Sequence, residues 1–514
     1  MTLAACGGPA DETVARVSDA WGDCEEGEGR CGRISVPLRL DGEGAATDET
    51  LSLRVRILPS RATQPAADPL FVLVGGPGQA ASEVGPLLRP VLDKIRAQRD
   101  VVLFDQRGTG DSSPLDCEFP DEHLSDITRS DFPADELERC LASYEVDPAQ
   151  FTTEHSVADI EAVRVALGYP KINLFGLSYG TRLGLAYLRR HSEVVRSAVF
   201  DGVAPPTRAL PSDMDVGAQS VLSMTLEACT KDPICAARFP ELPKRTKAWV
   251  EALDRTPLRL ELPHPRTGVP QPFMLDGGAA LGTLRAAAYV PESAALIPWT
   301  IDAATRGDYR PWVGLLQMGQ GTGDTISTGA FLSIVCAEDL ARAKPIESTD
   351  EAPNFFAGRM FDMLSEACGV WPRGEVPKDH AEPVVSEVAT LLLSGELDPA
   401  TPPEWATEAS RTLSNSRHLI VPGTGHGTWS RRCVDRLIAD FVETGSSAGL
   451  DFGCVEGVER AALFVGPAGP ATAASEARPL GEIEAELRGP ELPPASEVDA
   501  PEADAPTDEM EAAQ

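Results

Sequence analysis

Residues 176–180 read Gly-Leu-Ser-Tyr-Gly and place Ser178 between an apolar run at 171–175 and a helical pattern at 181–191. A serine becomes a nucleophile when a base can take its proton and when its hydroxyl stands clear of the backbone. A sharp turn from strand to helix meets the second condition, and flanking glycines let the two backbones pack closely enough to form it. Ser178 is therefore the predicted nucleophile of an acyl transfer.

An aspartate and a histidine follow the serine in the chain order that such a site requires. The buried-strand run 389–394 ends just before Asp398, and the run 418–421 leads into a glycine-rich loop that carries His426. We predict that Ser178 attacks, that His426 takes and returns the proton, and that Asp398 fixes the histidine tautomer and stabilises the imidazolium.

Each of these residues also has a simpler interpretation. The pattern G-x-S-x-G arises by chance, and Asp398 precedes a proline and could be a turn residue, in which case Glu396 is the substitute that orients the histidine. His426 could be an ordinary loop residue. The six other histidines fit the role less well, because they lie in polar or proline-flanked stretches, before Ser178, at the end of the following helix, or inside a strand.

A second glycine cluster can supply hydrogen-bond donors for an oxyanion. The apolar strand 70–74 runs directly into Gly-Gly-Pro-Gly at 75–78. Backbone N–H groups can approach a developing negative charge where no side chain blocks them. We expect the N–H groups of Gly76 and Tyr179 to form the oxyanion hole. The chain has no G-x-x-x-x-G-K-[ST] and no G-x-G-x-x-G that opens a helix, so we expect no nucleotide site.

The spacing of the candidate residues predicts a large insertion. Ser178 and Asp398 lie 220 residues apart, whereas a strand or two with their helices needs under about 100 residues. The stretch 205–383 is mostly helical in pattern, for example at 217–230, 244–253, 277–289 and 293–304. We expect it to form a helical cap over the nucleophile that selects substrates and excludes water.

Five motifs in order resemble the proline iminopeptidase and tripeptidyl aminopeptidase branch of the α/β-hydrolases, with a TAP-like C-terminal region. They are G-G-P-G at 75–78, D-Q-R-G-T-G-D-S at 105–112, G-L-S-Y-G-T-R-L-G at 176–184, G-E-L-D-P-A-T-P at 395–402 and G-H-G-T at 425–428. The resemblance covers roughly 32–456. It implies an α/β-hydrolase fold and a serine exopeptidase acting on peptide N-termini, with esterases among its relatives. The chain departs from the branch at Val74, where a histidine is usual.

The resemblance also suggests residues that recognise the substrate. An aminopeptidase has to bind an α-ammonium group, and a carboxylate over the pocket is the usual device. Glu338 and Asp339 follow a cysteine in the predicted cap and are similar to acidic residues near a cap cysteine in the tripeptidyl aminopeptidases. In a chain with so many acids, the pair can equally be a solvated helix end.

The composition limits the partners. The formal net charge is −34, which argues against nucleic acid or an anionic membrane surface as a partner. No run of 18 apolar residues predicts a transmembrane helix, and we expect neither a metal nor a cofactor. From residue 466 to the end the chain has twelve acidic and two basic residues among Ala and Pro. Such a segment buries too little apolar surface to fold, so we predict a disordered tail.

The cysteines indicate the compartment. Of eleven, Cys6 stands apart and ten fall into neighbouring pairs: Cys24 and Cys31, Cys117 and Cys140, Cys229 and Cys235, Cys336 and Cys368, Cys433 and Cys454. Sequence does not fix their connectivity, but an even set without metal-ligand spacing suggests disulfides and an exported protein. Residues 3–8, Leu-Ala-Ala-Cys-Gly-Gly, resemble a bacterial lipobox with only five residues before Cys6. Either the true start lies upstream and Cys6 carries a lipid anchor, which we favour, or Cys6 is an ordinary thiol.

Together these observations predict an α/β fold with a mostly parallel central sheet flanked by helices. We expect an export segment and linker at 1–31, core halves at 32–204 and 384–460, a helical cap at 205–383 inserted before the strand that carries the catalytic Asp, and the acidic tail at 466–514. The expected function is an exported serine peptidase, periplasmic, lipid-anchored at the surface or secreted, that acts on peptide N-termini. The alternatives are a carboxylesterase with the same triad and, more remotely, a non-catalytic surface binding module. Oligomeric state is not predictable.

Overall fold

The computed structural model describes residues 16–17, 21–24, 27–39, 49–119, 131–264, 267–323, 325–348, 354–431 and 433–470. Cys6 and most of the predicted tail, from 471 onwards, lie outside the described residues. The first residues of that predicted tail, 466–470, are described: they belong to a short turn that is closed by pairing of Pro470 with Phe464. All the described helices and strands belong to the compact unit that ends at Pro470.

One large sheet runs through this unit in the order β1-β3-β4-β6-β5-β7-β8-β11-β12, with β2 paired to β3. Its strands are β1 (Arg16–Val17), β2 (Gly22–Asp23), β3 (Arg30–Pro37), β4 (Thr50–Leu58), β5 (Leu70–Leu73), β6 (Val101–Phe104), β7 (Ile172–Leu177), β8 (Val195–Asp201), β11 (Ala389–Gly395) and β12 (Ser416–Val421). The pairings from β1 to β6 are antiparallel, and those from β6 to β12 are parallel. The carboxyl ends of the parallel strands therefore meet at one edge.

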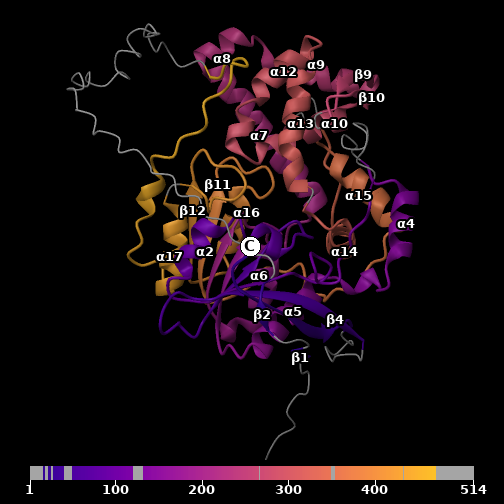
Figure 1. Ribbon diagram of the computed structural model, residues 1–514. Helices are drawn as coiled ribbons and strands as arrows, with labels where there is room; N and C mark the ends of the chain where they lie inside the picture. Colours follow the sequence, from indigo (N-terminus) through magenta and orange to yellow (C-terminus); the bar gives the residue numbers. More distant parts are fainter. Residues whose placement is uncertain are drawn as a thin grey trace, which may run out of the picture. The chain divides into compact units, whose positions relative to one another are not determined.

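Helices cover both faces of the parallel part of the sheet. As a result, β5, β6 and β11 are buried along their whole length, as parallel strands between helices usually are. Helices α5 (Thr153–Ala166) and α6 (Tyr179–His191) pack on one face, and α2 (Arg89–Ile95) and α17 (Val434–Thr444) pack on the other (Figure 1). Of the shorter helices, α1 (Ala81–Val84) packs against β6, and α16 (Pro403–Ser410) packs against β11 and β12. Helix α4 (Ala134–Ser143) packs instead against α15 (Arg359–Val370). The predicted α/β-hydrolase fold is confirmed.

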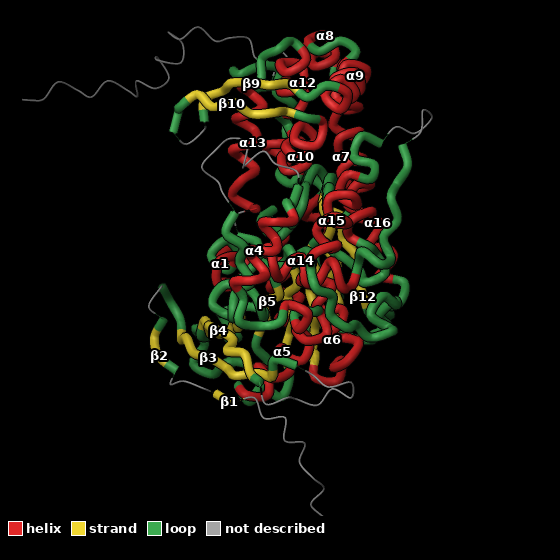
Figure 2. Tube along the Cα trace, turned by 90° about the vertical axis from the view of Figure 1, so that its right-hand side faces the viewer, coloured by secondary structure: helices red, strands yellow, loops and turns green. Residues whose placement is uncertain are grey.

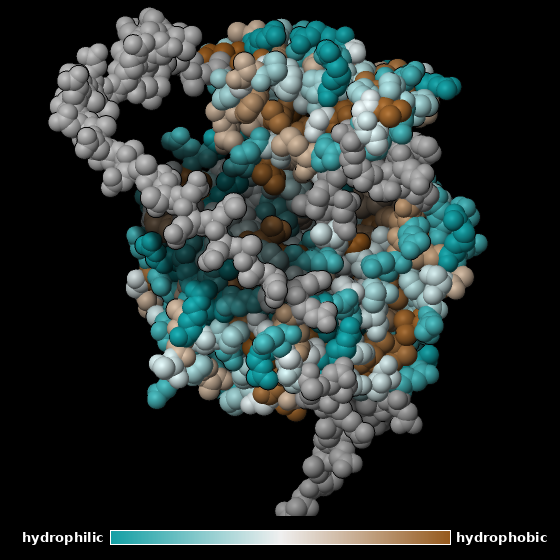
Figure 3. All heavy atoms as spheres, viewed as in Figure 1, coloured by the Kyte–Doolittle hydropathy of each residue, from teal (hydrophilic) through white to brown (hydrophobic). Residues whose placement is uncertain are grey.

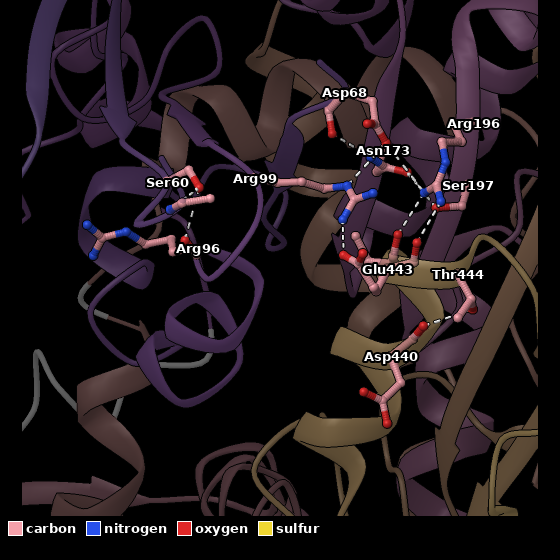
Figure 4. Close-up of polar contacts among 12 residues, drawn as sticks. Ser60, Asp68, Arg96, Arg99, Asn173, Arg196, Ser197, Asp440, Glu443 and Thr444 are labelled. Atoms are coloured by element: carbon pink, nitrogen blue, oxygen red, sulfur yellow. Dashed lines mark hydrogen bonds and ion pairs between the residues drawn. The ribbon is translucent and has the colours of Figure 1, made fainter. Parts of the chain in front are cut away.

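A polar network holds the amino ends of two central strands (Figure 4). Asn173 of β7 donates to the Asp68 carboxylate at 2.9 Å and accepts from Arg196 of β8 at 3.1 Å. Arg99 contacts both Asp68 and Glu443 of α17. These contacts tie the sheet to α17 at the edge opposite the candidate site, so they stabilise the frame and leave the carboxyl edge free for chemistry.

A long, mostly helical stretch lies between β8 and β11, and we call residues 202–388 the insert. Its elements are α7 (Leu210–Lys231), α8 (Pro233–Arg238), α9 (Leu242–Arg255), β9 (Leu258–Pro263), β10 (Pro270–Leu275), α10 (Gly277–Ala288), α11 (Pro291–Ala294), α12 (Ile297–Thr305), α13 (Arg310–Gly323), α14 (Thr328–Glu338) and α15 (Arg359–Val370). It has a hydrophobic core of its own around Trp249, Leu281 and Trp312.

Two details of the insert differ from the sequence prediction. The expected helix at 293–304 is two helices, α11 and α12. Pro298 lies in the first turn of α12, where a backbone N–H has no acceptor within the helix and its absence therefore breaks no hydrogen bond. The β9–β10 hairpin, visible beside α12 and α9 in Figure 2, was not predicted. On the face shown in Figure 3, apolar patches lie among hydrophilic side chains over this part of the chain.

Disulfides are present, as the sequence predicted, and they join the neighbouring cysteines. The bonds are Cys24–Cys31, Cys117–Cys140, Cys229–Cys235, Cys336–Cys368 and Cys433–Cys454. Two lie inside the insert, where they link α7 to α8 and α14 to α15. In the part of the chain that the structure describes, no helix has both the length and the apolar character needed to cross a membrane.

Candidate active site

Ser178 sits on a strained turn between β7, which ends at Leu177, and α6, which begins at Tyr179. Its backbone angles are φ 56° and ψ −125°, a region that residues other than glycine rarely adopt and that clusters at functional sites. Its N–H donates to the backbone carbonyl of Asp201 at 2.9 Å. The sharp strand-to-helix turn expected from residues 176–180 is therefore present.

The glycines of this turn are required by close backbone approach. A β-carbon on Gly180 would lie 2.0 Å from the carbonyl oxygen of Leu73, and one on Gly176 would lie 2.7 Å from that of Gly180. Leu73 ends β5 and leads into the predicted oxyanion loop, where a β-carbon on Gly75 would lie 2.7 Å from Cβ of Ser178. Strand, turn and glycine loop are thus pressed together around the candidate nucleophile.

Asp398 and His426 are brought together by the ends of β11 and β12. Nδ1 of His426 lies 2.8 Å from Oδ2 and 3.0 Å from Oδ1 of Asp398. Asp398 also accepts from the N–H groups of Ala400 and Thr401 and from the Thr401 hydroxyl, each at 2.8 Å. It is therefore a turn residue and a partner of the imidazole at once. Glu396, the substitute, binds the N–H of Gly423 instead.

The surroundings make His426 a stronger base than a free histidine. Burial acts to lower the pKa of His426, but the charge of Asp398 and its hydrogen bond, with a further contribution from Asp201, outweigh burial and raise that pKa. The imidazole side chain is 12% exposed. A nearly enclosed imidazole whose Nδ1 is held by a carboxylate has Nε2 available for proton transfer.

The insert holds the loop that carries His426. The N–H of His426 donates to the carbonyl of Tyr289 at 2.9 Å, and the two rings meet edge to face with centroids 5.2 Å apart. A β-carbon on Gly425 would lie 2.3 Å from that same carbonyl oxygen. Glu292 and Arg431 form an ion pair at 2.7 Å beside this contact. The position of the histidine loop thus depends on the insert.

The insert also touches the predicted oxyanion loop. The Gly78 carbonyl accepts from the N–H of Ser327 at 2.9 Å, and the Gln79 side chain donates to the Thr325 hydroxyl at 3.0 Å. Gly76 has φ 102°, which only glycine adopts freely. Tyr179 is the first residue of α6, so its N–H has no acceptor within the helix. The two predicted oxyanion donors therefore lie on the two segments that flank Ser178.

Glu338 and Asp339 are used inside the protein. The Glu338 carboxylate accepts from the N–H and the hydroxyl of Thr153 at 2.6 and 2.7 Å, and that hydroxyl is 2.7 Å from the Tyr179 hydroxyl. Asp339 is paired with Arg182 at 2.8 Å. Both carboxylates are buried, so their interpretation as a solvated helix end is wrong. The prediction that they bind a substrate amine gains no support from these contacts.

Sequence reasoning did not single out Asp201, which ends β8 at the same edge as the other candidate residues. Its buried carboxylate accepts from the N–H groups of Thr428 and Trp429 in the histidine loop. The available signal was its position: it is a carboxylate at the carboxyl end of a buried strand next to the nucleophile strand, where ligands and catalytic groups of parallel sheets gather.

The chain is similar to several known peptidases. A family described as TAP-like protein matches residues 353–454, which contain Asp398 and His426. Serine protease Hip1 of Mycobacterium tuberculosis is 25% identical over 475 residues, covering 81% of this chain and 85% of that protein. Tripeptidyl aminopeptidase of Streptomyces lividans is 28% identical over 217 residues, covering 38% and 40%. A probable proline iminopeptidase of Streptomyces coelicolor is 36% identical over 145 residues, covering 28% and 36%.

Proposed function

Because the chain belongs to the α/β-hydrolases, in the branch of the proline iminopeptidases and tripeptidyl aminopeptidases, and is a serine hydrolase, we propose that it is an exported peptidase that releases residues from peptide N-termini. The observation that carries the proposal is the pairing of His426 with Asp398 at 2.8 Å, at the same sheet edge as the strained turn of Ser178.

In the proposed mechanism, Nε2 of His426 takes the hydroxyl proton of Ser178 while Oγ attacks the carbonyl carbon of the scissile bond. The N–H groups of Gly76 and Tyr179 stabilise the negative charge on the carbonyl oxygen. The imidazolium, held by Asp398, then gives its proton to the leaving amine as the C–N bond breaks. A water molecule hydrolyses the acyl-enzyme by the same steps, and Ser178 regains its proton.

The insert acts in this proposal as a cap that admits short peptides and excludes folded proteins. Its contacts with the histidine loop and with the loop at Gly78 support that role, since they bring it to both sides of the nucleophile. Export is supported by the five disulfides, because such bonds persist in oxidising compartments. A lipid anchor on Cys6 stays part of the proposal, and intact-mass measurement of the membrane fraction tests it.

An ester hydrolase with the same catalytic residues is the second candidate function. The observation in its favour is that every carboxylate oxygen of Glu338 and Asp339 already has a donor within the protein. If these residues keep those partners when substrate binds, they are not available to an α-ammonium group. A substrate panel decides between the two functions.

The panel compares free-amine prolyl, alanyl and tripeptidyl amides, their N-blocked forms and short-chain esters. Cleavage of free-amine amides alone supports the peptidase, whereas dominant ester cleavage that blocking does not affect contradicts it. Ser178→Ala should lose activity by about 10⁴-fold or more. Ser113→Ala is the matched control, because Ser113 also has a positive φ, 54°, but takes no part in the proposed mechanism. This variant should keep full activity.

A further inference from the structure

Asp201 is a buried carboxylate that the proposed mechanism does not use. Its Oδ2 accepts from the N–H of Thr428 at 2.8 Å and from the N–H of Trp429 at 2.9 Å, while Oδ1 accepts from the N–H and the hydroxyl of Thr428 at 3.0 and 3.1 Å. All these donors belong to the segment directly after His426. One carboxylate at the end of β8 therefore binds the backbone N–H groups of two successive residues of the histidine loop.

The backbone of the same residue holds the nucleophile turn. The Asp201 carbonyl accepts the N–H of Ser178 at 2.9 Å. The next residue, Gly202, runs so close to the imidazole that a β-carbon there would lie 3.1 Å from Cε1 of His426. Asp201 thus contacts both segments that have to be aligned for proton transfer, and it does so through different atoms, its carbonyl for the serine and its carboxylate for the histidine loop.

The charge of this carboxylate also matters. Burial raises the pKa of Asp201 to about 6, although hydrogen bonds from Thr428 and Trp429 act to lower it. The groups that face the site from the neighbouring elements are the imidazole of His426, the carboxylate of Asp398 after β11, and the phenol of Tyr289 after α10. The anion of Asp201 contributes to the raised pKa of His426. It therefore stabilises the imidazolium in addition to Asp398.

We propose that Asp201 is a positioning residue: its carboxylate fixes the His426 loop against the Ser178 turn and supports the imidazolium that forms during the reaction. This inference rests on the proposed function, because it assigns Asp201 a part in that proton transfer. A carboxylate suits this task, since it accepts several hydrogen bonds at once and donates none. An amide of the same shape has one accepting oxygen and turns its NH₂ toward another donor.

Asp201→Asn is the direct test on the full-length protein. We expect kcat to fall by about 10- to 100-fold while KM stays within about twofold, since substrate contacts are unchanged. The acid limb of kcat/KM should move to lower pH by about one unit, because removing a nearby negative charge lowers the pKa of the imidazolium. Unchanged kcat together with an unchanged acid limb overturns the inference.

Asp215→Asn is the matched control. Asp215 on α7 is also a buried carboxylate with a raised pKa, about 7, caused mainly by burial, and it also accepts a backbone N–H, that of Met360. Its hydrogen bond goes to Met360 of α15 and not to the histidine loop. This variant should leave the acid limb where it is in the wild type. An equal displacement in both variants would mean that overall charge, and not Asp201, sets the profile.

A nuclear magnetic resonance titration separates this inference from the proposed function. With ¹³Cε1-labelled histidine, the His426 signal is assigned by its absence in His426→Ala, and its pKa is measured in wild type and Asp201→Asn. A lower pKa in the variant supports the coupling even if no peptide or ester is cleaved, in which case only the proposed function fails. If the wild type is active and the His426 pKa is the same in both proteins, only the inference about Asp201 fails.

A second pair of variants covers the case in which Asp201→Asn does not fold. Thr428→Val removes the hydroxyl donor to Oδ1 and keeps the two backbone donors, and Thr428→Ser restores the hydroxyl. We expect kcat to fall several-fold in Thr428→Val and to recover in Thr428→Ser. Full activity in Thr428→Val, or an equal loss in both variants, contradicts the positioning role.

Discussion

The contact between Gly180 and Leu73 leads to a sharp prediction for Gly180→Ala. The new β-carbon would lie 2.0 Å from the Leu73 carbonyl oxygen, 2.5 Å from its carbonyl carbon and 2.9 Å from the carbonyl oxygen of Val74. All three are backbone atoms of the strand that leads into the glycine loop. They cannot swing away as a flexible side chain can, so the strand and the helix themselves have to separate.

The size of the effect follows from that separation. Non-bonded heavy atoms pack at about 3.5 Å, so α6 and β5 must move apart by about 1 Å or more. Overpacking of this kind costs about 1–3 kcal/mol of stability. A displacement of about 1 Å between a nucleophile and its oxyanion donors costs about 10²-fold in rate, which corresponds to about 2.7 kcal/mol of transition-state stabilisation. We expect Gly180→Ala to lose both stability and kcat by these amounts.

The assay combines thermal unfolding, kcat on the best substrate of the panel, and the rate of serine labelling by a fluorophosphonate probe. Gly282→Ala is the control, because Gly282 lies inside α10 with no atom within 4 Å of the added carbon. It should gain about 0.5–1 kcal/mol of stability and keep its activity. If Gly180→Ala has wild-type stability and activity within twofold of the wild type, the reasoning from close backbone approach is refuted.

Three further changes have expected outcomes. Cys336 and Cys368 are 32 residues apart, and replacing both with serine should lower the free energy of unfolding by about 4 kcal/mol. The measurement is urea titration of the variant and of the wild type, with and without reductant; equal midpoints of the two proteins without reductant would contradict this. Thr401→Val removes a hydroxyl donor to Asp398 and should lower kcat about tenfold in steady-state kinetics. The raised pKa of Asp201 means that its contribution to stability is present at low pH and is lost as pH rises through about 6. The free energy of unfolding of the wild type relative to Asp201→Asn should therefore fall by about 3 kcal/mol between about pH 3 and about pH 8, and a pH-independent difference would refute this.

Local patterns were enough to predict the sheet and the turn at Ser178. Buried parallel strands are short apolar runs, and the turn needs glycines at fixed offsets, so both signals lie within a few residues of the feature they predict. The β9–β10 hairpin was missed because both strands are largely exposed and begin or end at prolines, which read as breakers rather than as strand residues. The sequence signal for that hairpin is therefore weak.

Contacts between distant segments could not be predicted. The carboxylate of Asp201 binds donors 227 residues further along the chain, and Glu338 binds Thr153 across 185 residues. Nothing local distinguishes an acid that faces a substrate from an acid that a distant loop has already engaged. The chain order of serine, aspartate and histidine could therefore be recognised from local motifs. The role expected of Glu338 and Asp339 depended on distant contacts, and it gained no support from them.

The carbonyl of Tyr289 has a consequence for how such enzymes can change over time. Any residue supplies a carbonyl, so the hydrogen bond to the N–H of His426 constrains the path of the main chain and not the residue type. We expect exchange of the outer helices of the insert to be tolerated where it leaves two segments in place. One is the stretch from Tyr289 to Glu292, because a graft that shifts it also shifts the histidine. The other is the segment at Thr325 and Ser327 that contacts the loop at Gly78. Chimeric enzymes should therefore be joined outside both segments, so that a change of specificity does not displace the catalytic loops.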